Sequence, residues 1–362
     1  MTKMPELSGS KPQVVLITGG SSGIGRCTAA LFARRGWRVG LVARGAEGLA
    51  ASRQDVEAAG ARAATAQADV SDRAALAEAA SAITAMLGPI DVWINCAGNG
   101  VYGYFEDVTQ AEFQRVTDVT YHGTVNGTRV ALAHMRSLGR GRIVNVCSAM
   151  AFHGLPLMSS YAGAKAAVRA FGQAVRGELK LARSPIRLTT VFPPAVNTPF
   201  FSHAASHMGW PARPARPVYQ PEVIAQGIWQ AVLSGRPEIT ISGTAAAFCL
   251  ATRIAPRLVA WCTGHMGIER QLTRDPNVCE LQEPILFLPS QRVFSVHGPF
   301  GRRARGWSAH LWLGRLLTMP ALWIMSVWRR WTGPRDVPWP STLVPPKLDR
   351  ELDGLASRAG DS

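Results

Sequence analysis

The chain has 362 residues, 47% of them hydrophobic and 17% charged, with a formal net charge of +15 at pH 7. This length suits one large α/β domain with an appendage or two ordinary domains, and the apolar content excludes a chain that is disordered throughout. The basic excess is spread along the chain, with 24 Lys and Arg against 15 Asp and Glu up to residue 242 and 15 against 9 beyond it. Since no Lys/Arg-rich block or DNA-reading motif is present, we expect no nucleic-acid partner.

The cysteines and the apolar runs argue against secretion and against a membrane span. Six cysteines are scattered without a CxxC pair or metal-type spacing, which is typical of reduced cytosolic thiols. The first 13 residues lack the apolar core of a secretory signal. The longest apolar run, residues 316–328, is shorter than the ~20 residues that span a bilayer. We expect a cytoplasmic protein without a transmembrane helix, with peripheral contact to a membrane left open.

Short β-branched runs alternate with helical patterns from residue 13 to about residue 241. A helix is expected at 23–36, and strands are expected at 13–19, 37–44, 61–70, 91–98, 141–148, 186–193 and 237–243. Alternation of this kind predicts an α/β fold with a doubly wound parallel sheet of about seven strands. Ligands of such sheets bind beyond the carboxyl ends of the strands.

The chain is expected to divide into three parts. Residues 1–242 form the nucleotide-binding domain, and the βα rhythm stops near residue 243. Residues 243–332 form a helical or loop extension that is basic and rich in tryptophan, and residues 333–362, where prolines cluster, form a flexible tail.

The stretch TGGSSGIG lies between the first strand and the first helix. Its glycines allow positive φ and a close approach of backbone to a pyrophosphate, and the following helix supplies free N–H groups at its amino end. A structural glycine turn is the alternative, but the strand-loop-helix context favours dinucleotide binding. The predicted cofactor contacts here are Thr18, Gly19, Ser21, Ser22, Gly23, Ile24 and Gly25.

The second strand ends at Arg44, nineteen residues after Gly25. An acidic residue at this place would bind the ribose 2′-hydroxyl of NAD, whereas a basic one accommodates the 2′-phosphate of NADP. Arg44 has no acid beside it and Arg26 adjoins the glycine loop, so NADP is favoured, with NAD possible. The alternative is that Arg44 is solvated and makes no contact with a cofactor.

Tyr161 lies four residues before Lys165 in a helix-forming run, so both side chains should emerge on one helix face. By itself such a pair is more often solvated than catalytic. The motifs TGxxxGIG, Asp69 after the third strand, Asn95 to Gly98 after the fourth, and Ser148 with Tyr161 and Lys165 occur in order over residues 10–242. In this combination the chain resembles the short-chain dehydrogenase/reductase family, which has a Rossmann fold and uses NAD(P).

The resemblance implies an oxidoreductase that interconverts an alcohol and a carbonyl by hydride transfer. Tyr161 is then the general acid/base, Lys165 its activator and a ligand of the nicotinamide ribose, and Ser148 the hydrogen-bond donor to the substrate carbonyl. A free phenol has a pKa near ~10, and a neighbouring ammonium lowers it. The remaining cofactor contacts implied by the resemblance are Asp69, Val70, Asn95, Ala97, Gly98, Pro193, Val196 and Thr198, besides Tyr161 and Lys165.

Three positions depart from the family pattern. The usual Asn-Asn-Ala-Gly has Cys96 as its second residue, and the usual Pro-Gly has Pro194. Thr120 stands where the family has the Asn of a water-linked proton relay. Its hydroxyl can donate and accept, so Thr120 is included among the catalytic residues, although water could reach Lys165 by another path.

The substrate side is expected to be apolar. Residues 198–219 would cover the substrate with Phe200, Phe201, Met208 and Trp210, and residues 100–105 and 152–158 add further apolar groups. His203 and His207 are spaced as metal ligands would be, but without a third ligand nearby we expect loop histidines and no metal.

Residues 302–331 carry six arginines, no acid and five tryptophans, and residues 245–261 have a similar pattern. Both segments fit contact with an anionic membrane surface or packing on the protein itself. They motivate a second hypothesis, a low-turnover NADP-binding protein that acts as a membrane-surface or partner-binding module. An intact Ser-Tyr-Lys set favours the enzyme. The resemblance also implies a homodimer or tetramer, formed through helices near 109–138 and 158–183.

Overall fold

The computed structural model describes residues 13–313 except residue 267. Its centre is a parallel sheet of seven strands in the order β11-β7-β6-β4-β1-β2-β3. The strands are β1 (Val14–Thr18), β2 (Arg38–Ala43), β3 (Ala63–Gln67), β4 (Val92–Asn95), β6 (Arg142–Val146), β7 (Arg187–Phe192) and β11 (Glu238–Thr240). Each overlaps one predicted strand, which confirms the doubly wound fold.

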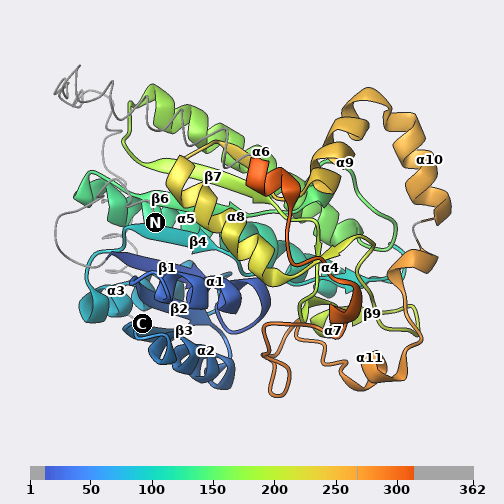
Figure 1. The fold of residues 1–362 in the computed structure, drawn as a ribbon, viewed down its shortest axis with the longest axis horizontal. Coiled ribbons are helices and arrows are strands. Elements are labelled where there is room, and N and C mark those ends of the chain that lie inside the picture. Colours follow the sequence, from blue (N-terminus) through green and yellow to red (C-terminus); the bar gives the residue numbers. More distant parts are fainter. Residues whose placement is uncertain (1–12, 267, 314–362) are drawn as a thin grey trace, which may run out of the picture.

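Helices cover both faces of the sheet (Figure 1). One face carries α1 (Gly23–Ala33), α2 (Ala46–Ala58) and α8 (Pro221–Ser234), and the other carries α3 (Arg73–Leu87), α5 (Gly123–Leu138) and α6 (Ser159–Leu181). Successive residues of β1 alternate between the layers, since Val15 and Ile17 join the first core and Val14 and Leu16 the second. A strand buried on both faces is apolar along its whole length, which is why these strands are recognisable in the sequence.

The long helix expected near 109–138 is interrupted. The chain forms α4 (Gln110–Thr117), then a π-helical turn over Asp118–His122, then α5. Widened turns of this kind occur often at functional sites, and this one carries Thr120.

Small elements close the carboxyl side of the sheet. They are β5 (Val101–Tyr102) paired with β9 (Ala205–Ser206), β8 (Ala195–Val196) paired with β10 (Val218–Tyr219), and α7 (Phe200–His203). These elements lie within the segment expected to cover the substrate, or directly against it.

Two helices follow residue 242, α9 (Gly243–Ile254) and α10 (Pro256–Met266), and they stand out from the body (Figure 1). After α11 (Pro276–Glu280) the chain runs back over the body with little regular structure. Within the described residues no single helix is long and apolar enough to cross a membrane. The helices α9 and α10 reach that length and apolar content only when they are taken together, and the chain bends by 118° between them. The predicted tail 333–362 lies outside the described residues.

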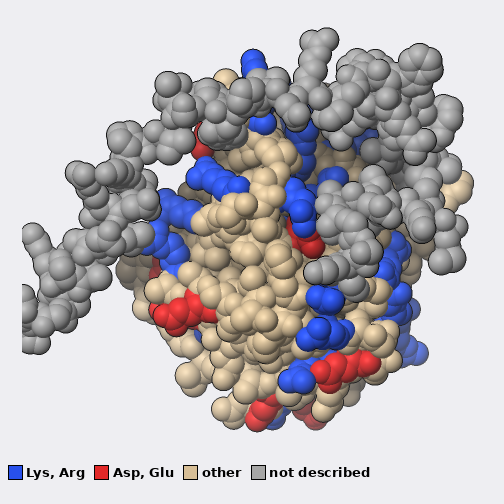
Figure 2. All heavy atoms as spheres, turned by 90° about the vertical axis from the view of Figure 1, so that its left-hand side faces the viewer, with Lys and Arg blue, Asp and Glu red and all other residues tan. Residues whose placement is uncertain are grey.

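Basic side chains are dispersed on the face seen in Figure 2, which is the left-hand side of Figure 1. Lys and Arg lie there in several separate places, with fewer Asp and Glu among them. The net positive charge is therefore not gathered into one stripe on this face.

Candidate active site

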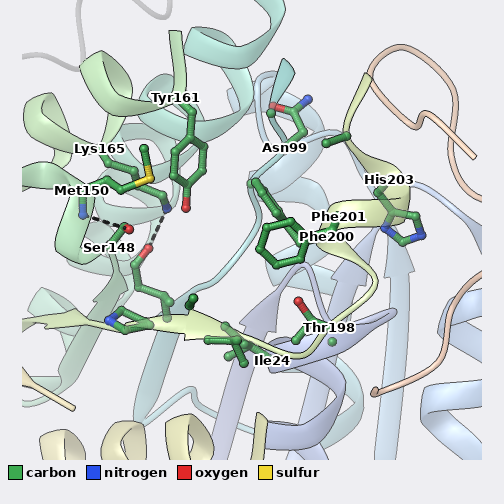
Figure 3. A pocket seen from close by; sticks show the side chains of 18 of the residues that line it. Ile24, Asn99, Ser148, Met150, Tyr161, Lys165, Thr198, Phe200, Phe201 and His203 are labelled. Carbon is green, nitrogen blue, oxygen red and sulfur yellow. Dashed lines mark hydrogen bonds between the residues drawn. The ribbon is translucent and has the colours of Figure 1, made fainter. Parts of the chain in front are cut away.

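A cavity of about 810 Å³ lies where the parallel strands end. Its wall is formed by the glycine loop, by the carboxyl ends of β2, β3, β4, β6 and β7, by α6 and α7, and by the extension. Figure 3 shows Tyr161, Lys165 and Ser148 on one side and Phe200 across from them. This is the place where doubly wound sheets bind their ligands.

Lys165 is buried in α6, with only 4% of its surface exposed. Its Nζ donates a 2.8 Å hydrogen bond to the carbonyl of Val146 at the end of β6 and lies 5.6 Å from the centre of the Tyr161 ring. Burial lowers the pKa of Lys165. The spacing of four residues thus brings the ammonium and the phenol to one helix face, as the sequence indicates.

Tyr161 faces the cavity, and its ring packs against Phe200 with 5.3 Å between ring centres. Burial raises the pKa of Tyr161 above its ordinary range, the nearby Cys147 thiol adds to this, and a hydrogen bond with Ser148 opposes it. Before any ligand binds, the phenol therefore holds its proton at neutral pH.

Ser148 follows β6 and begins a short 3₁₀ turn, Ala149–Ala151. Its Oγ accepts a 3.1 Å hydrogen bond from the backbone N–H of Met150, which fixes the side chain at the cavity wall. The hydroxyl keeps its own proton for donation to another acceptor.

The glycine loop fits a pyrophosphate. Gly19 and Gly23 have φ of +67° and +52°, which side chains rarely adopt. A Cβ on Gly25 would lie 2.1 Å from the carbonyl oxygen of Gly19. The cradle therefore exists only with glycines, and α1 begins directly behind it with no side-chain cap from Ser22. This geometry suits an anion at the helix amino end.

Arg44 lies at the carboxyl end of β2 on the cavity wall, as predicted. Its guanidinium donates to backbone carbonyls of the extension, at 2.5 Å to Ile285 and 3.0 Å to Phe287, and lies 4.0 Å from the carboxylate of Asp69. Burial alone would raise the pKa of Asp69, but hydrogen bonds from Arg115 and Ser71 outweigh it, so the pKa is lowered and the carboxylate is charged.

Most of the predicted site residues share this cavity. Its lining includes Gly19, Ser21, Ser22, Gly23, Ile24, Gly25, Arg44, Asp69, Val70, Ala97, Gly98, Ser148, Tyr161, Lys165, Pro193, Val196 and Thr198.

Thr18 and Asn95 are buried and do not line the cavity. The Thr18 hydroxyl accepts from the backbone N–H of Cys96 at 3.2 Å, which ties β1 to the turn after β4. The Asn95 amide donates to Asn145 at 2.8 Å and accepts from the Trp93 indole at 2.8 Å. In this structure both side chains hold strands together.

Thr120 is fully buried and does not line the cavity. Its hydroxyl lies 3.5 Å from the backbone nitrogen of Asn99 and 3.4 Å from the carbonyl oxygen of that residue. The structure therefore places Thr120 one layer behind the wall, against the turn that follows β4.

Asn99 is a candidate that sequence reasoning missed. It lines the cavity beside Gly98, is 4% exposed, and neither atom of its carboxamide has a hydrogen-bond partner among the described residues (Figure 3). Buried polar groups are normally paired, so this amide is positioned for a ligand. The sequence feature that could have identified Asn99 is its position directly after the Asn95 to Gly98 motif.

The substrate side is apolar, but its composition differs from the expectation. Phe200, Phe201 and Met158 line the cavity, whereas Met208 does not and Trp210 is 42% exposed. The extension supplies much of the remaining wall, through Thr244, Ala245, Phe248, Ala251, Leu258, Val259, Cys262 and Thr263. The sequence did not show that α9 and α10 reach the site, because their partners there are far away along the chain and no local pattern marks the contact.

The two histidines have separate partners. His203 is buried and its Nε2 lies 2.6 Å from the carbonyl oxygen of Val293, while His207 pairs with Glu112 at 3.0 Å. No group of three metal-ligating side chains occurs within residues 13–313 as far as the structure describes them.

Known proteins share both the sequence pattern and the fold. The sequence model of the family described as short chain dehydrogenase matches residues 13–209. The uncharacterized oxidoreductase YxnA of Bacillus subtilis is 32% identical over 250 residues, which are 68% of this chain and 70% of that protein. Levodione reductase of Leifsonia aquatica is 36% identical over 199 residues, covering 54% of this chain and 74% of the relative.

Solved structures agree. A short-chain dehydrogenase/reductase from Burkholderia phymatum in complex with NAD has a TM-score of 0.63 at 22% identity, covers 70% of this chain and 96% of its own, and shows the shared fold. A single-substitution variant of actinorhodin polyketide ketoreductase with NADPH has a TM-score of 0.54 at 28% identity, and covers 65% of this chain and 92% of its own. The chain belongs to the short-chain dehydrogenase family and is an NAD(P)-dependent oxidoreductase that interconverts alcohols and carbonyls.

Proposed function

We propose that this protein reduces a lipophilic ketone or aldehyde with NADPH, and that Tyr161 protonates the product alkoxide. The observation that carries the proposal is the pair formed by the half-buried Tyr161 and the buried Lys165 at the wall of a large apolar cavity. Because burial raises the pKa of Tyr161, the resting phenol is protonated at neutral pH and carries the proton that a product alkoxide would accept.

Ser148 and Lys165 support that proton transfer from two directions. The Ser148 hydroxyl donates to the substrate oxygen and stabilises the charge that develops on it. The Lys165 ammonium, held by the Val146 carbonyl, stabilises the phenolate that remains after the proton has left. When bound, the nicotinamide supplies the hydride. The walls formed by Phe200, Phe248 and Val259 exclude water from the reacting carbonyl.

The lining of the cavity indicates which part would hold the nucleotide and which part would hold the nicotinamide. The glycine loop, Asp69 and the turn Ala97–Gly98 would hold the nucleotide, and Pro193, Val196 and Thr198 would border the nicotinamide. The preference for NADPH depends on Arg44, the cationic group at the end of β2. To bind a 2′-phosphate, its guanidinium has to exchange carbonyl partners for phosphate oxygens, which form stronger charge-assisted hydrogen bonds.

A second candidate function is contact with an anionic membrane surface. The inner face of α9 and α10 lines the cavity, and their outer face exposes Leu250, Ile254 and Trp261 to 56%, 73% and 58%. No acidic residue occurs between Glu238 and Glu269, while Arg253 and Arg257 flank the exposed groups. An apolar surface that also carries two arginines suits an interface of anionic lipid, from which an apolar substrate could pass directly into the site.

The sequence of residues 302–331 also fits membrane contact, and the structure describes this segment only up to residue 313. Within that part Trp307 and Trp312 are exposed to 72% and 61%. The rest lies outside the described residues. A homo-oligomer through α4, α5 and α6, and the division into 1–242, 243–332 and 333–362, stay predictions.

Tyr161→Phe should abolish turnover and keep the cofactor. Loss of the general acid is expected to lower kcat by about 10²- to 10⁴-fold, while the phenyl ring keeps its contact with Phe200. The test is NADPH oxidation with a panel of lipophilic ketones, alongside fluorescence titration with NADPH. Tyr121→Phe, which removes a hydroxyl outside the cavity, is the control. Unchanged turnover in Tyr161→Phe would exclude the proposed acid.

Arg44→Ala should weaken NADPH selectively. Removal of a charge-assisted contact predicts a loss of about tenfold or more in affinity for NADPH and little change for NADH, measured by titrating the fluorescence of each nucleotide. Arg53→Ala removes an exposed guanidinium from α2 and serves as the control. An equal loss for both nucleotides would contradict a 2′-phosphate contact.

Asn99→Leu should stabilise the free protein and weaken ligand binding. Removing an unpaired buried amide is expected to raise the free energy of unfolding by about 1 kcal/mol, while the thermal shift produced by NADPH or a bound ketone shrinks. Asn126→Leu is the matched control. The Asn126 amide donates to the carbonyls of Val70 and Ser71 at 3.0 Å, so this change should destabilise. A destabilised Asn99→Leu with normal ligand binding would refute the assignment.

Ile254→Glu combined with Trp261→Glu should abolish binding to vesicles. The full chain is expected to float with vesicles that contain phosphatidylserine and to bind phosphatidylcholine vesicles weakly, because the arginines need anionic lipid. Leu181→Glu, at an apolar position on α6 that is even more exposed, controls for added charge. A wild-type chain that stays unbound would exclude the membrane contact. A dimer sensitive to the same changes would assign this surface to packing between copies.

A further inference from the structure

Residues 283–300, here called the strap, run from α11 back across the nucleotide end of the cavity. At one end the backbone N–H of Glu283 donates to the carbonyl of Ser202 at 2.9 Å. At the other end the N–H of Phe300 donates to Asn197 Oδ1 at 2.9 Å. Both anchors belong to the dehydrogenase body, so the strap is tied down on both sides of the site.

The strap contacts the glycine loop itself. The carbonyl of Ser295 accepts from the N–H of Gly23 at 3.0 Å, and the carbonyl of Phe294 accepts from Arg26 at 2.8 Å. A Cβ on Gly48 would lie only 3.2 Å from the Phe294 Cβ, so the start of α2 lies directly against the strap.

Arg44 joins the strap to the end of β2. Its guanidinium donates to carbonyls of four consecutive residues, Ile285 to Leu288, at 2.5, 3.4, 3.0 and 3.4 Å. Arg115 adds a 3.0 Å hydrogen bond to the carbonyl of Leu286, whose side chain is buried against Val101 and Val116. Two guanidinium groups beside Asp69 thus hold one short stretch of backbone.

The strap also has internal order. The carboxylate of Glu283 accepts from the Ser290 hydroxyl at 2.6 Å and from the N–H groups of Gln291, Arg292 and Val293 at 2.7, 3.1 and 3.0 Å. Burial alone would raise the pKa of Glu283, but these hydrogen bonds lower it, so the carboxylate stays charged. One side chain therefore fixes the bend of the strap without lining the cavity.

We propose that the strap is a built-in cover of the cofactor site, held by Arg115 and shaped by Glu283, and that it must open for the nucleotide to exchange. Five of its residues, Ile285, Pro289, Ser290, Val293 and Phe294, face the same cavity as the glycine loop. A nucleotide bound there is enclosed between loop and strap. The inference rests on the proposed cofactor site and adds a control on release from it.

The experiment measures release of bound NADPH and NADH from the full chain, by stopped-flow displacement followed through nucleotide fluorescence. Glu283→Ala removes the contacts that shape the strap, and release of both nucleotides should become about tenfold faster or more. Glu280→Ala removes the same charge from an exposed position on α11 and should release both at the wild-type rate. Trypsin cleavage after the exposed Arg292 reports independently whether the strap has loosened.

A reversible lock tests the cover by comparing two redox states of one protein. Gly48→Cys with Phe294→Cys places two Cβ atoms close to the separation that a disulfide needs. The oxidised form should release NADPH at least about tenfold more slowly than the same protein after reduction. Equal rates in the two forms, or faster cleavage of Glu283→Ala without faster release, would overturn the proposal. Failure of the wild type to bind either nucleotide would instead overturn the cofactor site on which the proposal rests.

Discussion

The chemistry of this protein depends on a buried ammonium. Lys165 is held by one hydrogen bond to the end of β6, and no carboxylate among the described residues pairs with it. Burial disfavours the charged form of each side chain, so it lowers the pKa of Lys165 and raises the pKa of Tyr161. The phenol therefore holds its proton until a stronger base, the product alkoxide, forms beside it. In the reverse direction the positive charge of an oxidised cofactor would favour the phenolate.

The rest of the fold brings other groups to that pair. Parallel strands end at one edge, so the glycine loop, Asp69, Ala97–Gly98 and Ser148 meet there although they are far apart in sequence. The extension completes the enclosure from the other side, with α9 and α10 at the substrate end and residues 283–300 at the nucleotide end. Both ends of the cavity are therefore bordered by the part of the chain that follows residue 242.

The body of the site could be predicted because its signals are local. Gly23 and Gly25 lie in the first turn of α1, and Tyr161 and Lys165 share a helical face, so spacing alone places them. Thr18, Asn95 and Thr120 keep their predicted elements but lie behind the wall, because spacing does not tell which side of a turn a side chain takes. The carbonyl partners of Arg44 come from residues more than 200 positions away, and backbone acceptors leave no trace in sequence.

The most direct test of the central claim is an ultraviolet titration of the Tyr161 phenol, read as the tyrosinate difference between wild type and Tyr161→Phe. Without cofactor, this account predicts that Tyr161 ionises above the ordinary phenol pKa of ~10, because burial disfavours the charged form. With oxidised cofactor bound, ionisation should move to lower pH, because the nicotinamide carries positive charge. A phenol that ionises below ~10 in the free protein, or one that the oxidised cofactor does not move, would contradict it.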